Sequence, residues 1–198
     1  MKVEIEMESE ISNSIINNML MSDGNNDMST YVKYENGENK YIAVDGILNK
    51  NSISAISNVV HIEFGKAVTK ISANTFNNAG EYKLSSIFFS NYTISSIGLC
   101  AFYNCNNLIF IDGGIIQSIS DVEDYAFANC RSLNSISIGT LSVSNNMFEN
   151  CTNLKTVNIA SSLNTIGNDA FKGCSGLSSI TIHNINSWCN TDFKNEDS

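Results

Sequence analysis

The sequence predicts an α/β solenoid, in which short coils stack side by side and each adds one strand to a parallel sheet. One pattern recurs five times: a β-branched residue, Phe five residues later, in most copies Cys after three more, then Leu and apolar positions at strand spacing. The repeats also follow one another at a steady period, because their Phe residues lie 21 to 26 residues apart, at positions 76, 102, 127, 148 and 171. Such a period is typical of solenoids, whose units bury their apolar faces only by stacking on neighbours.

Each repeat contains two segments with different expected structures. The Leu-x-x-Ile-x-Ile segment favours a short parallel strand, and the Ala-Phe-x-x-Cys segment favours a short helical or 3₁₀ turn. We therefore expect a parallel sheet on the concave side and helical or 3₁₀ turns on the opposite side. Insertions at coil corners, such as residues 91–93 and 113–114, explain the variable coil length.

The last repeat, residues 166–182, reads IGNDAFKGCSGLSSITI. It resembles the BspA-like leucine-rich repeat family (leucine-rich repeat type 5), whose unit runs Ile-Gly-x-x-Ala-Phe-x-x-Cys-x-x-Leu-x-x-Ile-x-Ile. Residues 41–48 are similar to the hairpin inserted in that family, and residues 187–193 to its Trp-Cys insertion. The chain departs from the family pattern in lacking Pro after the strand and in having Met147 before Phe148.

The resemblance covers about residues 41 to 193. It implies a leucine-rich repeat fold and a surface-associated or secreted binding protein, often one that acts in adhesion. The resemblance assigns no catalytic residue to this chain.

The pattern changes along the chain and predicts four parts. Residues 1–30 form a strand-helix extension, because residues 2–8 alternate and Ile11, Ile15, Ile16, Met19 and Leu20 have helical spacing. Residues 31–64 form a hairpin around Asn36-Gly37, which caps the first coil, and a degenerate capping repeat. The repeat solenoid proper occupies residues 65–186, and residues 187–198 form a C-terminal tail.

Charge and hydropathy exclude several partners. The net charge is −9, which argues against a nucleic-acid partner, because such binding needs cations to neutralise phosphates. No apolar run is long enough for a membrane span, so we expect no membrane insertion. The resemblance implies a cell-surface or extracellular location, although residues 1–8 lack the apolar segment of a secretory signal.

Cys105, Cys130, Cys151 and Cys174 occupy the same repeat position. Stacked coils would place them about 4.7–4.9 Å apart, and that distance leaves disulfide pairing open. Their recurrence in successive coils favours free buried thiols that act as small apolar side chains.

No catalytic, metal or cofactor site is predicted. His61 and His183 are the only histidines, and we expect two surface or edge residues too far apart to share a site. No Cys of the ladder has a second Cys or His beside it, as a zinc site would require. The chain is therefore not expected to be an enzyme.

The outward positions of the predicted sheet are the candidate binding residues. Most of them are Ser, Thr or Asn, and two are Phe; we select Phe88, Phe110, Asp112, Ser137, Asn158 and Thr181. Exposed adjacent aromatic residues mark partner surfaces. Cover by the hairpin or by the N-terminal segment is an equal alternative for Phe88 and Phe110.

Two functions remain open at this point. The first is non-enzymatic, adhesin-like binding of a protein or a surface glycan through the repeat sheet. The second is a structural role in a larger assembly, such as a virion or a surface layer, with residues 1–30 as the anchor to an assembly partner.

Overall fold

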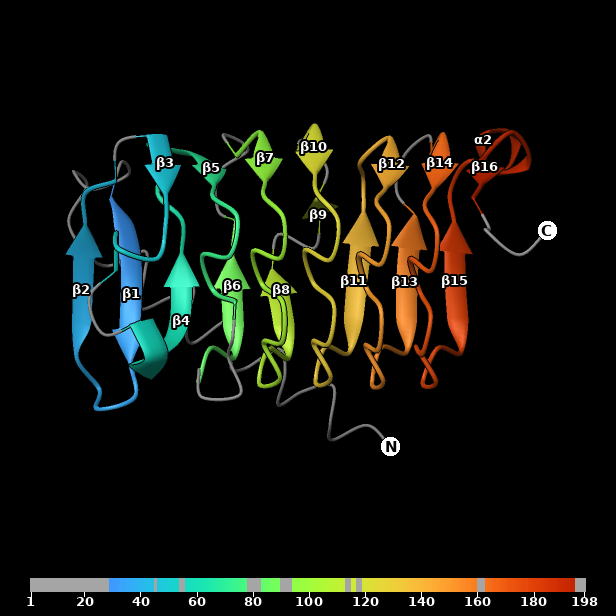
Figure 1. Ribbon diagram of the computed structural model, residues 1–198. Helices are drawn as coiled ribbons and strands as arrows, with labels where there is room; N and C mark the ends of the chain where they lie inside the picture. Colours follow the sequence, from blue (N-terminus) through green and yellow to red (C-terminus); the bar gives the residue numbers. More distant parts are fainter. Residues whose placement is uncertain are drawn as a thin grey trace.

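The computed structural model describes residues 29–44, 46–53, 56–77, 83–89, 94–112, 115–116, 119–159 and 163–194. These residues form a solenoid of about six coils whose strands lie in two rows (Figure 1). The expected N-terminal strand and helix, at residues 2–8 and 11–20, lie outside the described residues.

The first row, lower in Figure 1, faces one side of the solenoid. A five-stranded sheet has the order β2 (Asn39–Ile42), β1 (Thr30–Tyr34), β4 (Val59–Glu63), β6 (Ser86–Phe88) and β8 (Phe110–Asp112). A second sheet continues the row with β9 (Ile115–Ile116), β11 (Ser135–Ile138), β13 (Thr156–Ile159) and β15 (Ser179–Ile182). We call the solvent side of this row the outer face.

The second row consists of strands that open each repeat. One sheet contains β3 (Gly46–Leu48), β5 (Val68–Ile71), β7 (Ser96–Ile97) and β10 (Asp121–Val122). The other contains β12 (Ser142–Val143), β14 (Thr165–Ile166) and β16 (Asp192–Phe193). The prediction of one parallel sheet was therefore incomplete, because strands of two residues carry no period that a sequence pattern can show.

The helical part of the prediction was wrong. Among the described residues only η1 (Ile56–Asn58) and α2 (Ile185–Cys189) are helical. Most coils place a residue with positive φ two positions before Phe and another two positions after it, for example Asn146 (54°) and Asn150 (58°) around Phe148. Left-handed residues break a helix, so the Ala-Phe-x-x-Cys segments form consecutive turns instead.

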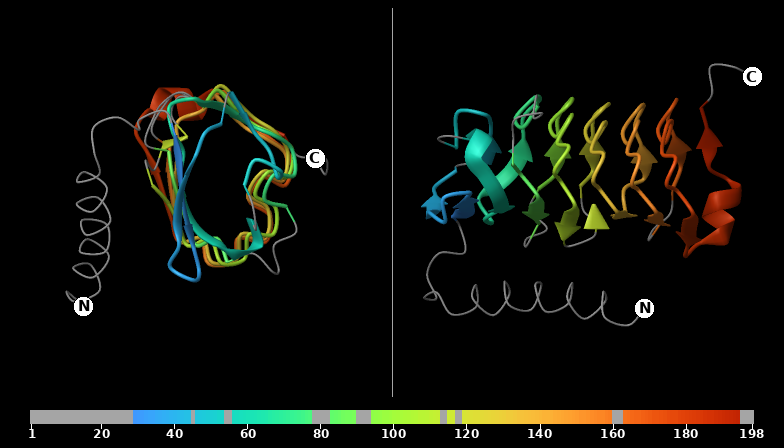
Figure 2. Two further views of the ribbon diagram at one scale, coloured as in Figure 1. Left: turned by 90° about the vertical axis from the view of Figure 1, so that its left-hand side faces the viewer. Right: turned by 90° about the horizontal axis from the view of Figure 1, so that it is seen from below.

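The stack is nearly straight. Figure 2 shows the coils following one another along one axis, with the two rows of strands and the turns enclosing the interior. The parallel sheet expected on a concave side thus lies on one flank of a straight solenoid.

The predicted hairpin is confirmed. Strands β1 and β2 pair antiparallel through Tyr31 and Tyr41, and β1 also pairs antiparallel with β4. The hairpin therefore covers the edge that the first parallel strand would otherwise expose, as a cap must.

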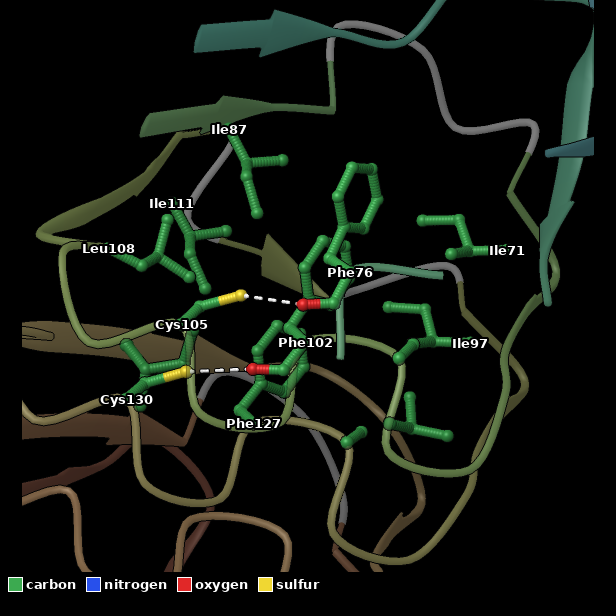
Figure 3. Packing of buried hydrophobic residues seen from close by; sticks show 14 of the residues in the cluster. Ile71, Phe76, Ile87, Ile97, Phe102, Cys105, Leu108, Ile111, Phe127 and Cys130 are labelled. Atoms are coloured by element: carbon green, nitrogen blue, oxygen red, sulfur yellow. Dashed lines mark hydrogen bonds between the residues drawn. The ribbon is translucent and has the colours of Figure 1, made fainter. Parts of the chain in front are cut away.

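A ladder of stacked Phe rings fills the interior. Centroids of successive rings are 4.9, 5.2, 5.7 and 5.4 Å apart, and their planes differ by no more than 12°, for Phe76, Phe102, Phe127, Phe148 and Phe171 in turn. The first four rings are fully buried. Ile and Val side chains of both strand rows pack around them (Figure 3).

The ladder cysteines are free thiols, and they do more than fill space. Each thiol donates to the carbonyl of the Phe in the preceding coil: Cys105 to Phe76 (3.6 Å), Cys130 to Phe102 (3.3 Å), Cys151 to Phe127 (3.3 Å) and Cys174 to Phe148 (3.1 Å). Figure 3 shows the first two of these bonds. Cys is thus small and apolar enough for the interior and still satisfies a buried carbonyl.

Helix α2 closes one side of the last coil. Trp188 packs against the core and its ring lies 5.2 Å from that of Phe193 in β16, which pairs with β14. The hydroxyl of Thr191 donates to the Leu163 carbonyl at 2.7 Å. These contacts tie residues 185–193 to the preceding coil.

Candidate binding surface

Five ring-bearing side chains lie next to one another on the outer face, one from each strand of the first sheet. This aromatic row consists of Tyr41 (β2), Tyr31 (β1), His61 (β4), Phe88 (β6) and Phe110 (β8). Successive ring centroids are 5.3, 5.9, 5.3 and 6.1 Å apart, and adjacent planes are tilted by 57° to 68°.

Strand alternation explains why these rings point outward. In β4, β6 and β8 the inward positions are Ile62, Ile87 and Ile111, which are at most 4 % exposed. Their sequence neighbours must therefore lie on the opposite side of the sheet. The contacts run diagonally, because Phe88 is paired in register with Glu63 and Phe110 with Ser86.

The two candidate Phe residues differ in exposure. Phe88 is only 8 % exposed, and the rings of His61 and Phe110 lie on either side of it. Phe110 is 39 % exposed and borders the polar half of the outer face. Of this pair, Phe110 is the one whose ring a partner can reach.

His61 is buried, so the expectation of a surface or edge histidine was wrong for this residue. It is 5 % exposed, and its Nδ1 lies 2.7 Å from the Ser86 hydroxyl oxygen. Among the described residues its Nε2 has no hydrogen-bond partner. Burial, with a smaller contribution from Lys33, lowers the pKa of His61 to about 4, so the ring is neutral at pH 7.

The polar half of the outer face lies over β11, β13 and β15. Register aligns Ser137, Asn158 and Thr181 in one line, as the sequence predicted. Thr181 is exposed and the other two are half-buried. The Nε2 atom of His183, which is exposed as expected, lies 2.9 Å from the Asn158 Oδ1 atom.

Asp112 pairs in register with Phe88 at the junction of the two halves. The six candidate residues thus belong to one row of strands. Hydroxyl and amide groups in register can donate and accept hydrogen bonds, and the Phe110 ring adds an apolar contact. This arrangement suits an uncharged or weakly charged partner surface.

Sequence reasoning missed Tyr31, Tyr41 and His61 as members of this surface. The missing information was the antiparallel pairing of β1 with β4, which brings Tyr31 beside His61 from 30 positions earlier in the chain. The alternation Tyr31-Val32-Lys33 was the available signal, because Val32 is the buried position of that strand.

Three thiols of the ladder are poor nucleophiles. Burial raises the pKa values of Cys130, Cys151 and Cys174 above the ordinary value of a thiol, so they stay protonated at pH 7. Within the described ranges, no group of three or more His, Cys, Asp or Glu side chains is placed to hold a metal ion. No helix in the described part is both long and apolar enough to cross a bilayer.

Solved structures share this fold. A leucine-rich cell surface protein from Faecalibacterium prausnitzii A2-165 is 19 % identical over 81 % of this chain and 53 % of its own, with a TM-score of 0.50. A leucine-rich repeat protein from Eubacterium ventriosum is 21 % identical over 80 % of this chain and 41 % of its own, with a TM-score of 0.57. The chain thus matches about half the length of these proteins or less.

The T. pallidum leucine-rich repeat protein is 17 % identical, with a TM-score of 0.50, and the match covers 87 % of this chain and 86 % of that one. No curated protein sequence matches the chain. The family model described as the BspA type leucine-rich repeat region matches six copies of its repeat, over residues 34–141 and 69–198. From its repeats and its fold together, the chain is a member of the BspA-type leucine-rich repeat family.

Proposed function

We propose that the chain is a non-enzymatic binding protein that acts at the cell surface and recognises a protein or a glycan through its outer face. The observation that carries this proposal is the partly exposed Phe110 ring beside an in-register line of hydroxyl and amide side chains on β11, β13 and β15. An aromatic anchor beside adaptable polar groups is the usual composition of a recognition surface.

The low charge of this surface further supports the proposal. The outward positions of β11, β13 and β15 are Ser135, Ser137, Thr156, Asn158, Ser179 and Thr181. None of these side chains is charged, so a partner loses little solvation of ionic groups on binding. The name of the F. prausnitzii structure, a cell surface protein, is consistent with the proposed location.

The test compares two charge-matched double variants on a panel of immobilised glycans and extracellular glycoproteins. F110K combined with T181K places two lysines on the outer face. L141K combined with S142K places the same charges at exposed positions of the second strand row, where Leu141 is 59 % exposed.

We expect the wild type and the second-row variant to bind the same members of the panel, and the outer-face variant to lose them. Equal binding by all three proteins would place the partner elsewhere on the solenoid. Failure of the wild type to bind any member would reject the proposal for these ligand classes.

A further inference from the structure

The hairpin of strands β1 and β2 packs on a buried histidine at one end of the first row (Figure 1). We call residues 30–42 the capping hairpin. His61, on β4, is 5 % exposed, and its ring lies between those of Tyr31 (β1) and Phe88 (β6), with centroids 5.9 and 5.3 Å away. We propose that the capping hairpin is an acid-sensitive cap, which protonation of His61 releases from β4 while the other coils stay folded. This inference concerns the cap alone and does not depend on the proposed function.

The surroundings of His61 provide a hydrogen-bond partner for only one of its two ring nitrogens. Nδ1 lies 2.7 Å from the hydroxyl oxygen of Ser86. Nε2 is buried, and within the described ranges it has no hydrogen-bond partner. A protonated imidazole carries an N–H on both nitrogens, so protonation leaves a buried donor at Nε2 without an acceptor. The closed cap therefore favours the neutral ring.

A cation on the capping hairpin adds to this preference. Lys33 of β1 is paired in register with His61, so both side chains lie on the outer face of the sheet. Ser86 and Phe88, the side chains of β6 that contact the ring, are uncharged. The titratable groups around the ring on the capping hairpin and on β4 are Tyr31, Lys33, Tyr41 and Glu63. Burial first, and the charge of Lys33 second, lower the pKa of His61 to about 4.

The capping hairpin can open without unfolding the other coils. In a solenoid each unit is stabilised by its neighbours, and a terminal unit has a neighbour on one side only. In the described part of the chain, β4 is the solenoid strand with which the hairpin pairs, and that pairing shifts register between Lys33 and Tyr34. The ion pair between Glu35 and Lys83 lies at the surface, where such pairs contribute little. Local opening is therefore less costly than global unfolding.

Opening couples the cap to pH because it returns His61 to water. Tyr31 leaves together with β1, and the pKa of His61 then rises from about 4 toward its ordinary value of 6.5. Because the closed state has the lower pKa, its stability is complete above pH 6.5 and is lost as the pH falls toward 4. Between pH 7 and pH 5 these two pKa values raise the opening equilibrium constant by up to about 20-fold.

Release of the cap changes what this end of the solenoid presents. The edge of β4 loses its partner strand, and the buried Val59 and Ile62 lie on the inner side of that edge. A strand edge backed by apolar residues can pair with another extended chain. The cap therefore controls access to this edge.

The test is hydrogen–deuterium exchange of the full chain at pH 7 and pH 5, read by mass spectrometry of its peptides. Each exchange rate is divided by the intrinsic rate at the same pH, which gives the opening equilibrium constant of that peptide. In the wild type we expect this constant to rise several-fold, and by up to about 20-fold, in peptides of β1 and β4. Peptides of β11 and β13 should keep theirs. In H61Q, whose side chain does not titrate, the rise in β1 and β4 should be absent.

A second pair of variants tests the proposal without changing the buried side chain. K33Q removes the cation opposite His61, and K70Q removes one from β5 in the second row; both lysines are exposed, where the fold tolerates change. Because Lys33 lowers the pKa of His61, K33Q should raise that pKa and reduce the response of β1 and β4 to acid. K70Q should respond as the wild type does.

Three results would overturn the proposal. The first is an unchanged opening constant of β1 and β4 in the wild type. The second is an equal rise in H61Q, which would assign the response to another group. The third is an equal rise in β11 and β13, which would show acid destabilisation of the whole solenoid. No ligand is present in this experiment, so each of these results leaves the binding proposal and its test unaffected.

Discussion

Truncation of the central ring of the Phe ladder tests the packing of the whole solenoid. Phe127 is fully buried, with Phe102 5.2 Å away on one side and Phe148 5.7 Å away on the other. Replacement by Ala removes the ring and leaves a cavity between two rings that are held by their own coils. Buried Phe-to-Ala changes lower the unfolding free energy by about 3–5 kcal/mol. We expect the upper half of that range, because the two neighbouring rings cannot move into the cavity.

The assay is urea denaturation followed by two probes. Far-UV circular dichroism reports all coils, while the single tryptophan, Trp188, reports the C-terminal end. In a solenoid each coil is stabilised by its neighbours, so a defect in the middle weakens the coupling between the two ends. We expect a lower midpoint by both probes and a separation of the two transitions in F127A that is absent in the wild type.

The matched control is F110A, which removes the same ring from a residue that is 39 % exposed. It should cost only about 1–2 kcal/mol, because part of that ring is already in water. If F127A unfolds at the wild-type midpoint, or is no less stable than F110A, the assigned repeat register and the stacked ladder are wrong.

Three further predictions address the turns, the buried histidine and the thiols. G98A should destabilise the chain by about 3 kcal/mol in the same urea assay, because a Cβ at Gly98 would lie 2.5 Å from the Ala73 backbone nitrogen; a midpoint within experimental error of wild type would contradict this contact. The pKa of His61 is lowered to about 4 in the folded chain, below its ordinary value of 6.5. The stability that depends on a neutral His61 is therefore fully present above pH 6.5, and it is lost as the pH falls toward 4. Between pH 7 and 4.5 the wild type should therefore lose about 2 kcal/mol more unfolding free energy than H61Q, and equal losses would refute a buried neutral ring. Alkylation of the native chain should spare Cys105, Cys130 and Cys151, and alkylation after unfolding without reductant should modify all three; missing thiols in the unfolded count would indicate disulfides.

The interior was predictable because each of its positions repeats. Phe recurs in all five repeats and Cys follows it at constant spacing in four of them, and stacking similar units places like residues over one another. The ladder of Phe rings and the in-register line of Ser137, Asn158 and Thr181 follow from this rule alone. No knowledge of contacts between distant parts of the chain is needed.

The turns could also have been recognised. Asn residues stand two positions from Phe in several coils, as at Asn104, Asn129 and Asn150, and Asn is one of the few residues that adopt positive φ readily. Their spacing argues against a helix across the Ala-Phe-x-x-Cys segment. The prediction of helical or 3₁₀ turns relied on the apolar residues of this segment and did not take the Asn residues into account.

The sequence by itself determined the solenoid, its period, its interior residues and the outward direction of the polar positions, because all of these depend on spacing within one repeat. Only the tertiary structure decided the second row of strands, the burial of His61 and the extension of the aromatic row to Tyr31 and Tyr41. The physical reason is that the row depends on β1 pairing with β4, a contact between an unrepeated hairpin and the first coil. Such pairing follows from the whole assembled sheet and leaves no periodic trace in the chain.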